Sequence, residues 1–155
     1  MNPIGYVRSP YQDGAKIPKG PGAQHDAEGW LEIRPELEAG LADIEGFSHL
    51  YVIWVFDRAD GVSLTATPPS DDRPHGVFAT RSPRRPNALG LSVVRLVRVA
   101  GTRVDIEDVD MLDGTPLLDI KPYVPALDVR ATERIGWFAG KVDNVYRARS
   151  DERFV

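Results

Sequence analysis

The 155-residue sequence contains no cysteine, which excludes a disulfide, a thiolate zinc site and a cysteine nucleophile. Its longest uninterrupted apolar run, LYVIWVF at residues 50–56, is much shorter than the roughly 20 residues that span a bilayer as a helix. The N-terminus, MNPIGYVRSPY, lacks the basic-then-apolar pattern of a secretory signal peptide. We therefore expect a cytoplasmic protein that is not associated with a membrane.

Several common motifs of catalysis and nucleotide binding are also missing. No Gly-x-Gly-x-x-Gly follows a predicted strand, and there is no phosphate-binding P-loop sequence. No serine lies in a Gly-x-Ser-x-Gly elbow. The three histidines, His25, His49 and His75, have no histidine partner at the short spacing typical of compact zinc sites. The sequence therefore favours neither a Rossmann nucleotide site nor a metal site.

Acidic residues are absent from a long internal segment. Between Arg73 and Val104 there are seven arginines and no Asp or Glu, although the formal net charge of the chain is −4. A basic segment in an acidic chain can attract a polyanion locally while the remainder repels it. On charge alone, the alternative that these arginines are solvated and paired with acids from elsewhere in the fold is equally good.

The remaining composition is that of an ordinary globular domain, with 42% hydrophobic and 27% charged residues. This length supports a hydrophobic core, so we expect a single domain over residues 1–155 without a C-terminal extension. Fourteen glycines and 13 prolines indicate short strands and structured loops. One substantial helix is predicted at residues 36–45, because Pro35 suits its first turn and Leu37, Leu41 and Ile44 recur at helical spacing.

The strand pattern favours a mainly β protein. Strands are expected within residues 3–11, at the buried run 49–57, and as a pair over residues 90–109 joined by the turn AGT. GVFAT at residues 76–80 also looks like a strand, whereas residues 113–125 look turn-rich and residues 131–139 predict a short helix. A closed or nearly closed sheet fits this content better than alternating βαβ units.

Four loops combine small residues with backbone donors, at residues 19–24, 56–61, 78–90 and 108–116. Glycine lets a ligand approach the main chain, and proline reduces the entropy that a loop loses on binding. Asp57 ends the buried strand, where its carboxylate could accept hydrogen bonds from ribose hydroxyls or an amine. Taken singly, each loop is more simply a tight turn. The four together favour a pocket, but they do not identify its ligand.

Three sequence segments resemble the TsaA-like (TrmO) family in their residues and in their order along the chain. They are FSHLYVIWVFD, HGVFATRSPRRPNALGLSVVRL and DVDMLDGTPLLDIKPYVP, and the resemblance extends from Ile4 to Asp128. It implies a single β-barrel that is not a Rossmann sheet, and an S-adenosylmethionine-dependent methyltransferase. The family's reaction places a methyl group on N6 of N6-threonylcarbamoyladenosine, beside the anticodon of certain tRNAs. The resemblance also implies a homodimer, and the apolar, Pro-rich PLLDIKPYVP at residues 116–125 looks exposed enough to contribute to its interface. Better-known bacterial members carry an additional C-terminal domain.

The resemblance also implies which residues bind the methyl donor and the RNA. Arg84 and Arg85 would meet tRNA phosphates, while an arginine of the same loop would hold an anionic group at the pocket. Asp57 and Asp110 are the candidates for the carboxylate that removes the proton from the reacting nitrogen, and the sequence does not choose between them. The residues implied to contact S-adenosylmethionine are Pro21, Gly22, Ala23, Asp57, Arg58, Arg81, Leu91, Asp110, Met111, Leu112 and Asp113.

Two other functions stay open. The chain could be a non-catalytic β-barrel that binds S-adenosylmethionine or a nucleotide and senses it. It could also be a methyltransferase that acts on a substrate other than tRNA.

Overall fold

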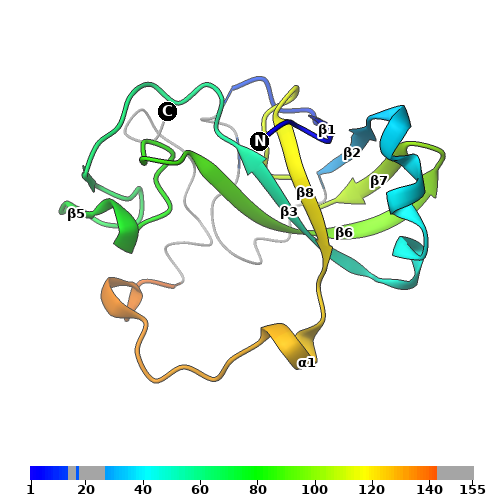
Figure 1. The fold of residues 1–155 in the computed structure, drawn as a ribbon. Coiled ribbons are helices and arrows are strands. Elements are labelled where there is room, and N and C mark those ends of the chain that lie inside the picture. The colour runs from blue at the N-terminus through cyan, green and yellow to red at the C-terminus, as the bar shows by residue number, and fades with distance from the viewer. Residues whose placement is uncertain (14–16, 18–26, 143–155) are drawn as a thin grey trace.

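The computed structural model describes residues 1–13, 17 and 27–142, and its main feature is a closed barrel (Figure 1). Six strands pair in the order β1-β2-β7-β6-β3-β8, and every pairing is antiparallel. The strands are β1 Gly5–Arg8, β2 Glu28–Ile33, β3 His49–Val55, β6 Leu89–Ala100, β7 Arg103–Glu107 and β8 Pro116–Pro122. The prediction of a mainly β, non-Rossmann barrel is confirmed.

The barrel interior follows from the alternation of side chains along the strands. On β3, Leu50, Val52 and Trp54 are buried, whereas the intervening Tyr51 and Ile53 face outward. The same alternation on the other strands fills the barrel with branched aliphatic side chains, joined by Val109 and Met111 from the connection after β7. The interior is therefore a packed core.

Residues 113–125 were expected to be turn-rich, and for residues 116–122 this expectation is wrong. Residues 116–122 form β8, which closes the barrel by pairing with β1 through Gly5↔Leu117 and with β3. Leu117 is fully buried. Pro116 and Pro122 stand at the two ends of the strand, where the missing backbone N–H removes the least from a ladder of hydrogen bonds.

The helix predicted at residues 36–45 is also corrected. The chain forms two 3₁₀ helices, η2 Pro35–Leu41 and η3 Ile44–Gly46, with Asp43 in the left-handed region between them at φ 68°. Residues three apart eclipse in a 3₁₀ helix, so the apolar stripe expected of an α-helix does not face one surface. Leu41 and Ile44 pack against the core, while Leu37 is 40% exposed.

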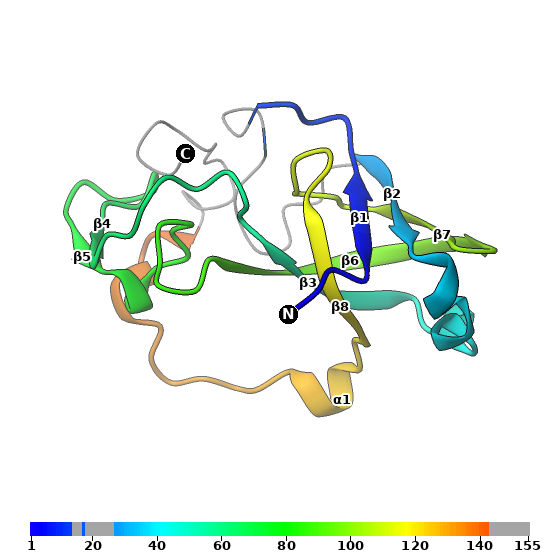
Figure 2. The ribbon, with the colours of Figure 1, turned by 45° about the horizontal axis from the view of Figure 1, so that its top comes forward.

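The chain between β3 and β6 forms a second, smaller unit beside the barrel, which Figure 2 shows around β4 and β5. We call residues 61–88 the arginine lobe. It contains the short hairpin of β4 Thr65–Ala66 with β5 His75–Gly76, followed by the 3₁₀ turn η4 Val77–Ala79. The strand expected at residues 76–80 is therefore wrong beyond Gly76, because the chain turns there instead of extending.

After β8 the chain leaves the barrel through the short helix α1 Pro125–Asp128 and returns to the arginine lobe at η5 Gly136–Phe138 (Figure 2). Only this three-residue 3₁₀ turn forms where a short helix was predicted over residues 131–139. Within the part of the chain that the structure describes, no helix has both the length and the apolar character to cross a membrane.

Candidate functional site

One end of the barrel gathers several of the predicted binding residues, and we call it the loop end. It comprises the chain after β1, the chain after β3, and residues 108–115 before β8. Arg58 Nη2 donates a hydrogen bond to the carbonyl of Asp113 at 2.6 Å. The Asp113 carboxylate accepts a hydrogen bond from the amide of Ser9 at 3.1 Å. Two of the predicted binding residues, Arg58 and Asp113, are thus brought together.

A buried hydrogen-bonded chain reaches Asp110 from inside the barrel. Trp54 Nε1 donates to Ser92 Oγ at 3.0 Å, and Ser92 Oγ donates to Asp110 Oδ1 at 2.6 Å. Trp54 and Ser92 are both buried, and Asp110 is half-buried. Because a buried hydroxyl and indole N–H need partners, this chain fixes the orientation of the Asp110 carboxylate.

Sequence reasoning missed both Trp54 and Ser92 as site residues. They are 38 positions apart, and only the pairing of β3 with β6 brings them together. A small polar residue at an inward position of a strand is the only available signal, since Ser92 interrupts the apolar alternation between Gly90 and Val94.

The second candidate base, Asp57, has different surroundings. It is exposed and forms no hydrogen bond or ion pair with any residue the structure describes. Its carboxylate is therefore available as an acceptor, but nothing in the described chain orients it. Asp110 is held in place, whereas Asp57 is free to meet a ligand.

Two further predicted binding residues direct their side chains away from this cluster, although the Met111 carbonyl accepts a hydrogen bond from Ser9 Oγ at 2.6 Å. Leu91 is 64% exposed on the outward face of β6, opposite to the inward-facing Ser92. Met111 is fully buried in the barrel core, so it presents no surface of its own to a ligand. Its neighbour Leu112 is half-buried in the same connection. Pro21, Gly22 and Ala23 lie outside the described residues.

The acid-free arginine segment divides into two parts. On the barrel, Arg95 pairs with Glu107, while Arg98 and Arg103 both pair with Asp105. The hydrogen bond from Arg103, with that from Arg98, lowers the pKa of Asp105 below its usual value. Three arginines of the segment therefore pair with the two acids of β7, as the second interpretation predicts, whereas attraction of a polyanion stays a prediction.

The arginines of the lobe are not neutralised in this way. Arg81 is exposed, and it has no hydrogen-bonding or ionic partner within residues 1–13, 17 and 27–142. Arg84 is half-buried, and its Nε finds no partner in the described chain. Arg85 Nη1 donates to the carbonyls of Thr80 at 3.0 Å and Ser82 at 3.2 Å. Arg85 therefore braces its own loop.

A cluster around Asp71 attaches the C-terminal segment to the arginine lobe. The Asp71 side chain is 1% exposed, and it accepts hydrogen bonds from Lys141 Nζ at 2.6 Å and His75 Nε2 at 2.7 Å. The bond from Lys141, followed by that from His75, holds the Asp71 pKa well below its ordinary value. Trp137 stacks on His75 with ring centroids 4.8 Å apart. In the described chain, His, Asp and Glu form no group of three suited to a metal ion.

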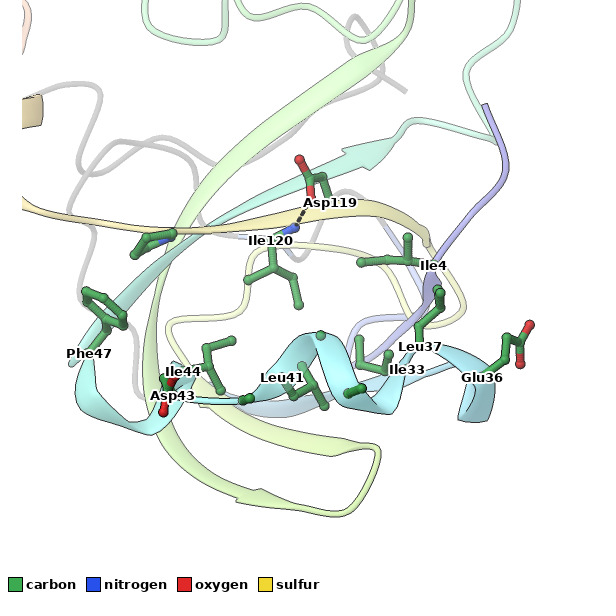
Figure 3. Close-up of a pocket in the computed structure, with 14 residues that line it drawn as sticks. Ile4, Ile33, Glu36, Leu37, Leu41, Asp43, Ile44, Phe47, Asp119 and Ile120 are labelled. Atoms are coloured by element: carbon green, nitrogen blue, oxygen red, sulfur yellow. Dashed lines mark hydrogen bonds between the residues drawn. The ribbon is translucent and has the colours of Figure 1, made fainter.

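A pocket of about 480 Å³ lies away from the loop end, between the 3₁₀ helices and the barrel (Figure 3). Apolar side chains such as Ile4, Ile33 and Ile120 line it, with the carboxylates of Glu36 and Asp119 among its lining residues. None of the predicted binding residues belongs to this pocket. It is the space that remains where the irregular η2 and η3 cover the barrel incompletely.

A family model described as the tRNA-methyltransferase O N-terminal domain matches residues 6–129. A protein of Pyrococcus abyssi named a probable S-adenosyl-L-methionine-binding protein is 51% identical over 98% of this chain and 83% of its own length. An S-adenosyl-L-methionine-binding protein of Archaeoglobus fulgidus is 39% identical over 83% of this chain and 91% of its own.

More distant relatives carry the name of an enzyme. The human tRNA (adenine(37)-N6)-methyltransferase is 36% identical to this chain. The aligned region covers 81% of this chain and 30% of that protein. The crystal structure of TrmO from Pseudomonas aeruginosa superposes with a TM-score of 0.74 at 39% identity, covering 88% of this chain and 61% of that one. The chain thus spans less than two thirds of these two proteins.

Proposed function

Because the chain belongs to the tRNA-methyltransferase O N-terminal domain family, we propose that it is an S-adenosylmethionine-dependent methyltransferase acting on N6 of N6-threonylcarbamoyladenosine in tRNA. One observation carries the catalytic part of this proposal. Asp110 is a carboxylate oriented by a buried hydrogen-bonded chain at the end of the barrel where predicted binding residues meet. A protein that only stores a ligand has no need for a carboxylate held in this way.

The loop end and the lobe offer partners for three polar groups of S-adenosylmethionine, its amine, its carboxylate and its ribose hydroxyls. Asp57 is exposed and uncommitted, so it would accept hydrogen bonds from hydroxyls or the amine. Arg81 is exposed and unpaired among the described residues, so it would bind a carboxylate of cofactor or substrate. When bound, the cofactor supplies an electrophilic methyl group.

Asp110 is the better of the two candidates for the proton acceptor. The reacting nitrogen lies between an aromatic ring and a carbamoyl group, so it becomes nucleophilic when its proton leaves. A base must be positioned within hydrogen-bonding reach of that proton. Ser92 holds one oxygen of Asp110 and Trp54 holds Ser92, whereas Asp57 has no such support. Positioning of this kind is the main contribution a protein makes to a displacement reaction.

The proposal is tested by incubating the purified protein with deuterated-methyl S-adenosylmethionine and tRNA that contains N6-threonylcarbamoyladenosine. Mass spectrometry of the digested nucleosides should show one labelled methyl group on that nucleoside. Binding of the cofactor without any transfer would favour the sensing barrel. Transfer to another molecule in a cell extract, with none to tRNA, would favour a different substrate.

Asp110→Asn should reduce turnover by about 100-fold or more, within the range expected for loss of a general base. The affinity for S-adenosylmethionine, measured by titration calorimetry, should change much less. Ser92→Ala should give a smaller loss of turnover, because the carboxylate remains but loses its orientation. Equal turnover in Asp110→Asn and the unmutated protein would exclude Asp110 as the base.

We also propose that the chain is a homodimer, as the family resemblance implies. The outward faces of β3 and β6 support this, because paired positions carry apolar side chains: Tyr51↔Val93, Ile53↔Leu91 and Val55↔Leu89. Leu91 is 64% exposed, and Leu89 and Val93 are each 41% exposed. A contiguous apolar surface of this kind commonly marks an interface.

A further inference from the structure

The arginine lobe exposes large apolar side chains around η4. Phe78 is 77% exposed, Leu64 is 70% exposed and Val62 is 58% exposed. The amide of Val77 donates to the carbonyl of Leu64 at 2.9 Å, so Leu64 lies beside the 3₁₀ turn that carries Phe78. Single exposed apolar residues are ordinary on a protein surface, but an aromatic ring that is three-quarters exposed, on a turn bonded to a second exposed apolar residue, is unusual.

The same lobe carries positive charge that no carboxylate of the described chain neutralises. Arg73, Arg81, Arg84 and Arg85 all lack an ion pair with the described residues, in contrast to the three arginines of the barrel. Asp71, the buried acid of the lobe, is already occupied by His75 and Lys141. The lobe therefore carries guanidinium groups without an ion pair as well as the exposed ring, which favours a polyanion over an apolar protein surface as its partner.

The turn that carries Phe78 is held from several sides. Thr80 donates from its amide, at 3.1 Å, and from its hydroxyl, at 2.9 Å, to the carbonyl of Val77. Trp137 Nε1 donates to the carbonyl of Ala79 at 2.7 Å. Arg85 bonds the carbonyl of Thr80 at 3.0 Å on the next turn of chain. A ring presented on a braced turn loses little conformational entropy when a ligand stacks on it.

We propose that Phe78 is a stacking residue for an unpaired RNA base, with the lobe arginines contacting the phosphates on either side. The proposal deepens the function proposed above and rests on it. Aromatic rings and arginines together are the usual means of binding single-stranded nucleic acid. An unpaired base is required because bases inside a duplex are already stacked on their neighbours. The lobe would thereby hold a loop of the RNA beside the loop end of the barrel.

The test uses the full-length protein and a fluorescein-labelled RNA hairpin with an unpaired loop, with a blunt duplex of equal length as a second probe. Phe78→Ala should weaken hairpin binding by at least about fivefold, the lower end of what one stacked base contributes. Phe78→Trp should restore affinity, and Phe78→Leu should not, because leucine retains apolar bulk without a ring face. Leu127→Ala, which removes a 67% exposed side chain on α1, is the matched control and should bind normally.

The salt dependence separates stacking from charge. Phe78→Ala should leave the slope of log affinity against log salt unchanged, since stacking releases no counterions. Arg73→Ala should reduce both the affinity and the slope, by about 0.7–0.9 for a lost phosphate contact. Duplex binding should be unaffected by Phe78→Ala.

Equal hairpin affinity of Phe78→Ala and the unmutated protein would overturn the stacking role alone. A molar mass of Phe78→Ala that differs from that of the unmutated protein in light scattering would also overturn the stacking role, because the ring would then contribute to a contact between copies of the chain. Failure of the unmutated protein to bind the hairpin would count against the tRNA substrate as well. Thermal melts of every variant confirm that the exposed positions do not alter folding.

Discussion

At the scale of single residues, three aspartates show how surroundings divide one chemical group among different roles. Asp57 is exposed and free among the described residues, so it is suited to meet a ligand. Asp110 is half-buried and oriented by Ser92, so it is suited to accept a proton at a fixed place. Asp71 is buried between His75 and Lys141, so its charge is used to join two parts of the chain.

Replacing Arg81 with alanine should reduce S-adenosylmethionine affinity or turnover by at least about tenfold, the loss of one charge-assisted contact of roughly 1.5–3 kcal/mol. The melting temperature of the ligand-free protein should barely change, because Arg81 is exposed and forms no hydrogen bond or ion pair within the described chain that would be lost. Arg81→Lys should rescue only in part, since an ammonium cannot reproduce the planar fork of a guanidinium. Titration calorimetry beside a thermal melt measures both effects. Unaltered cofactor binding and methylation in Arg81→Ala would remove this residue from the site.

Replacing Asp71 with asparagine should change how stability depends on pH. The folded-state pKa of Asp71 lies below its unfolded value, so its stabilising contribution is present above the unfolded pKa and is lost as the pH falls toward the folded one. As the pH is lowered below about 5, the urea concentration at the unfolding midpoint should therefore decrease in the unmutated protein. In Asp71→Asn the same decrease should be less steep. Asp71→Asn should also be the less stable at neutral pH. Asp60→Asn, at an exposed position, is the control, and parallel curves for all three proteins would contradict the prediction.

At the scale of elements, the pairing of β3 with β6 determines the interior of the site. The register places Trp54 opposite Gly90, and a Cβ atom built on Gly90 would overlap the indole ring. The absence of a side chain at this position therefore lets the indole lie against the neighbouring strand. There its Nε1 reaches Ser92, two residues further along β6.

Gly90→Ala should destabilise the protein by about 1–3 kcal/mol, the usual cost of inserting a methyl group into a packed interior. It should also lower turnover, because displacing the indole disturbs the chain that orients Asp110. Gly40→Ala is the matched control, since a Cβ there meets no atom within 4 Å and alanine restricts the unfolded chain. Denaturant unfolding should show that the two variants change the free energy of unfolding in opposite directions, or by clearly unequal amounts. Similar shifts would argue against the role given to Gly90.

The elements also show what the sequence could predict. Continuous β-branched and aromatic runs identified β3 and the hairpin of β6 with β7, because side-chain alternation is a local property. β8 was missed because its prolines look like turn signals, although they stand at the strand ends. The candidate site was predicted as a set of loops, but Trp54 and Ser92 were not, because contact between them exists only once two strands have found their register.

At the scale of the whole molecule, the apolar outward face of β3 and β6 is the surface on which we place the second copy of the proposed dimer. Of the apolar residues at positions 116–125, Leu117 and Ile120 do not contribute to this surface, because Leu117 is buried and Ile120 packs against the core. Charged pairs border the face on both sides, with Lys121–Asp119 on β8 and Arg95–Glu107 between β6 and β7. An apolar centre with a polar rim is the common arrangement of an interface.

Val93→Glu should convert a dimer to a monomer, because it places a charge in the centre of this face. Light scattering at micromolar concentration should give twice the chain mass of 17.1 kDa for the unmutated protein and the chain mass for the variant. Leu127→Glu, which adds the same charge on α1, should remain a dimer. A mass near 17.1 kDa for the unmutated protein would count directly against the homodimer.

The closed order of the six strands also has a consequence for how fast the protein acquires its structure. The last seam of the barrel joins Gly5 to Leu117, so it cannot form until the chain has been synthesised beyond Leu117 and its two ends have come together. Most strand pairings likewise join distant parts of the chain, and such topologies fold on the millisecond to second scale. Before the seam forms, β1 pairs only with β2 and β8 only with β3, so each strand has one edge of free backbone groups that can pair with other chains. Speed of closure, rather than final stability, therefore sets the period in which the new chain is open to aggregation.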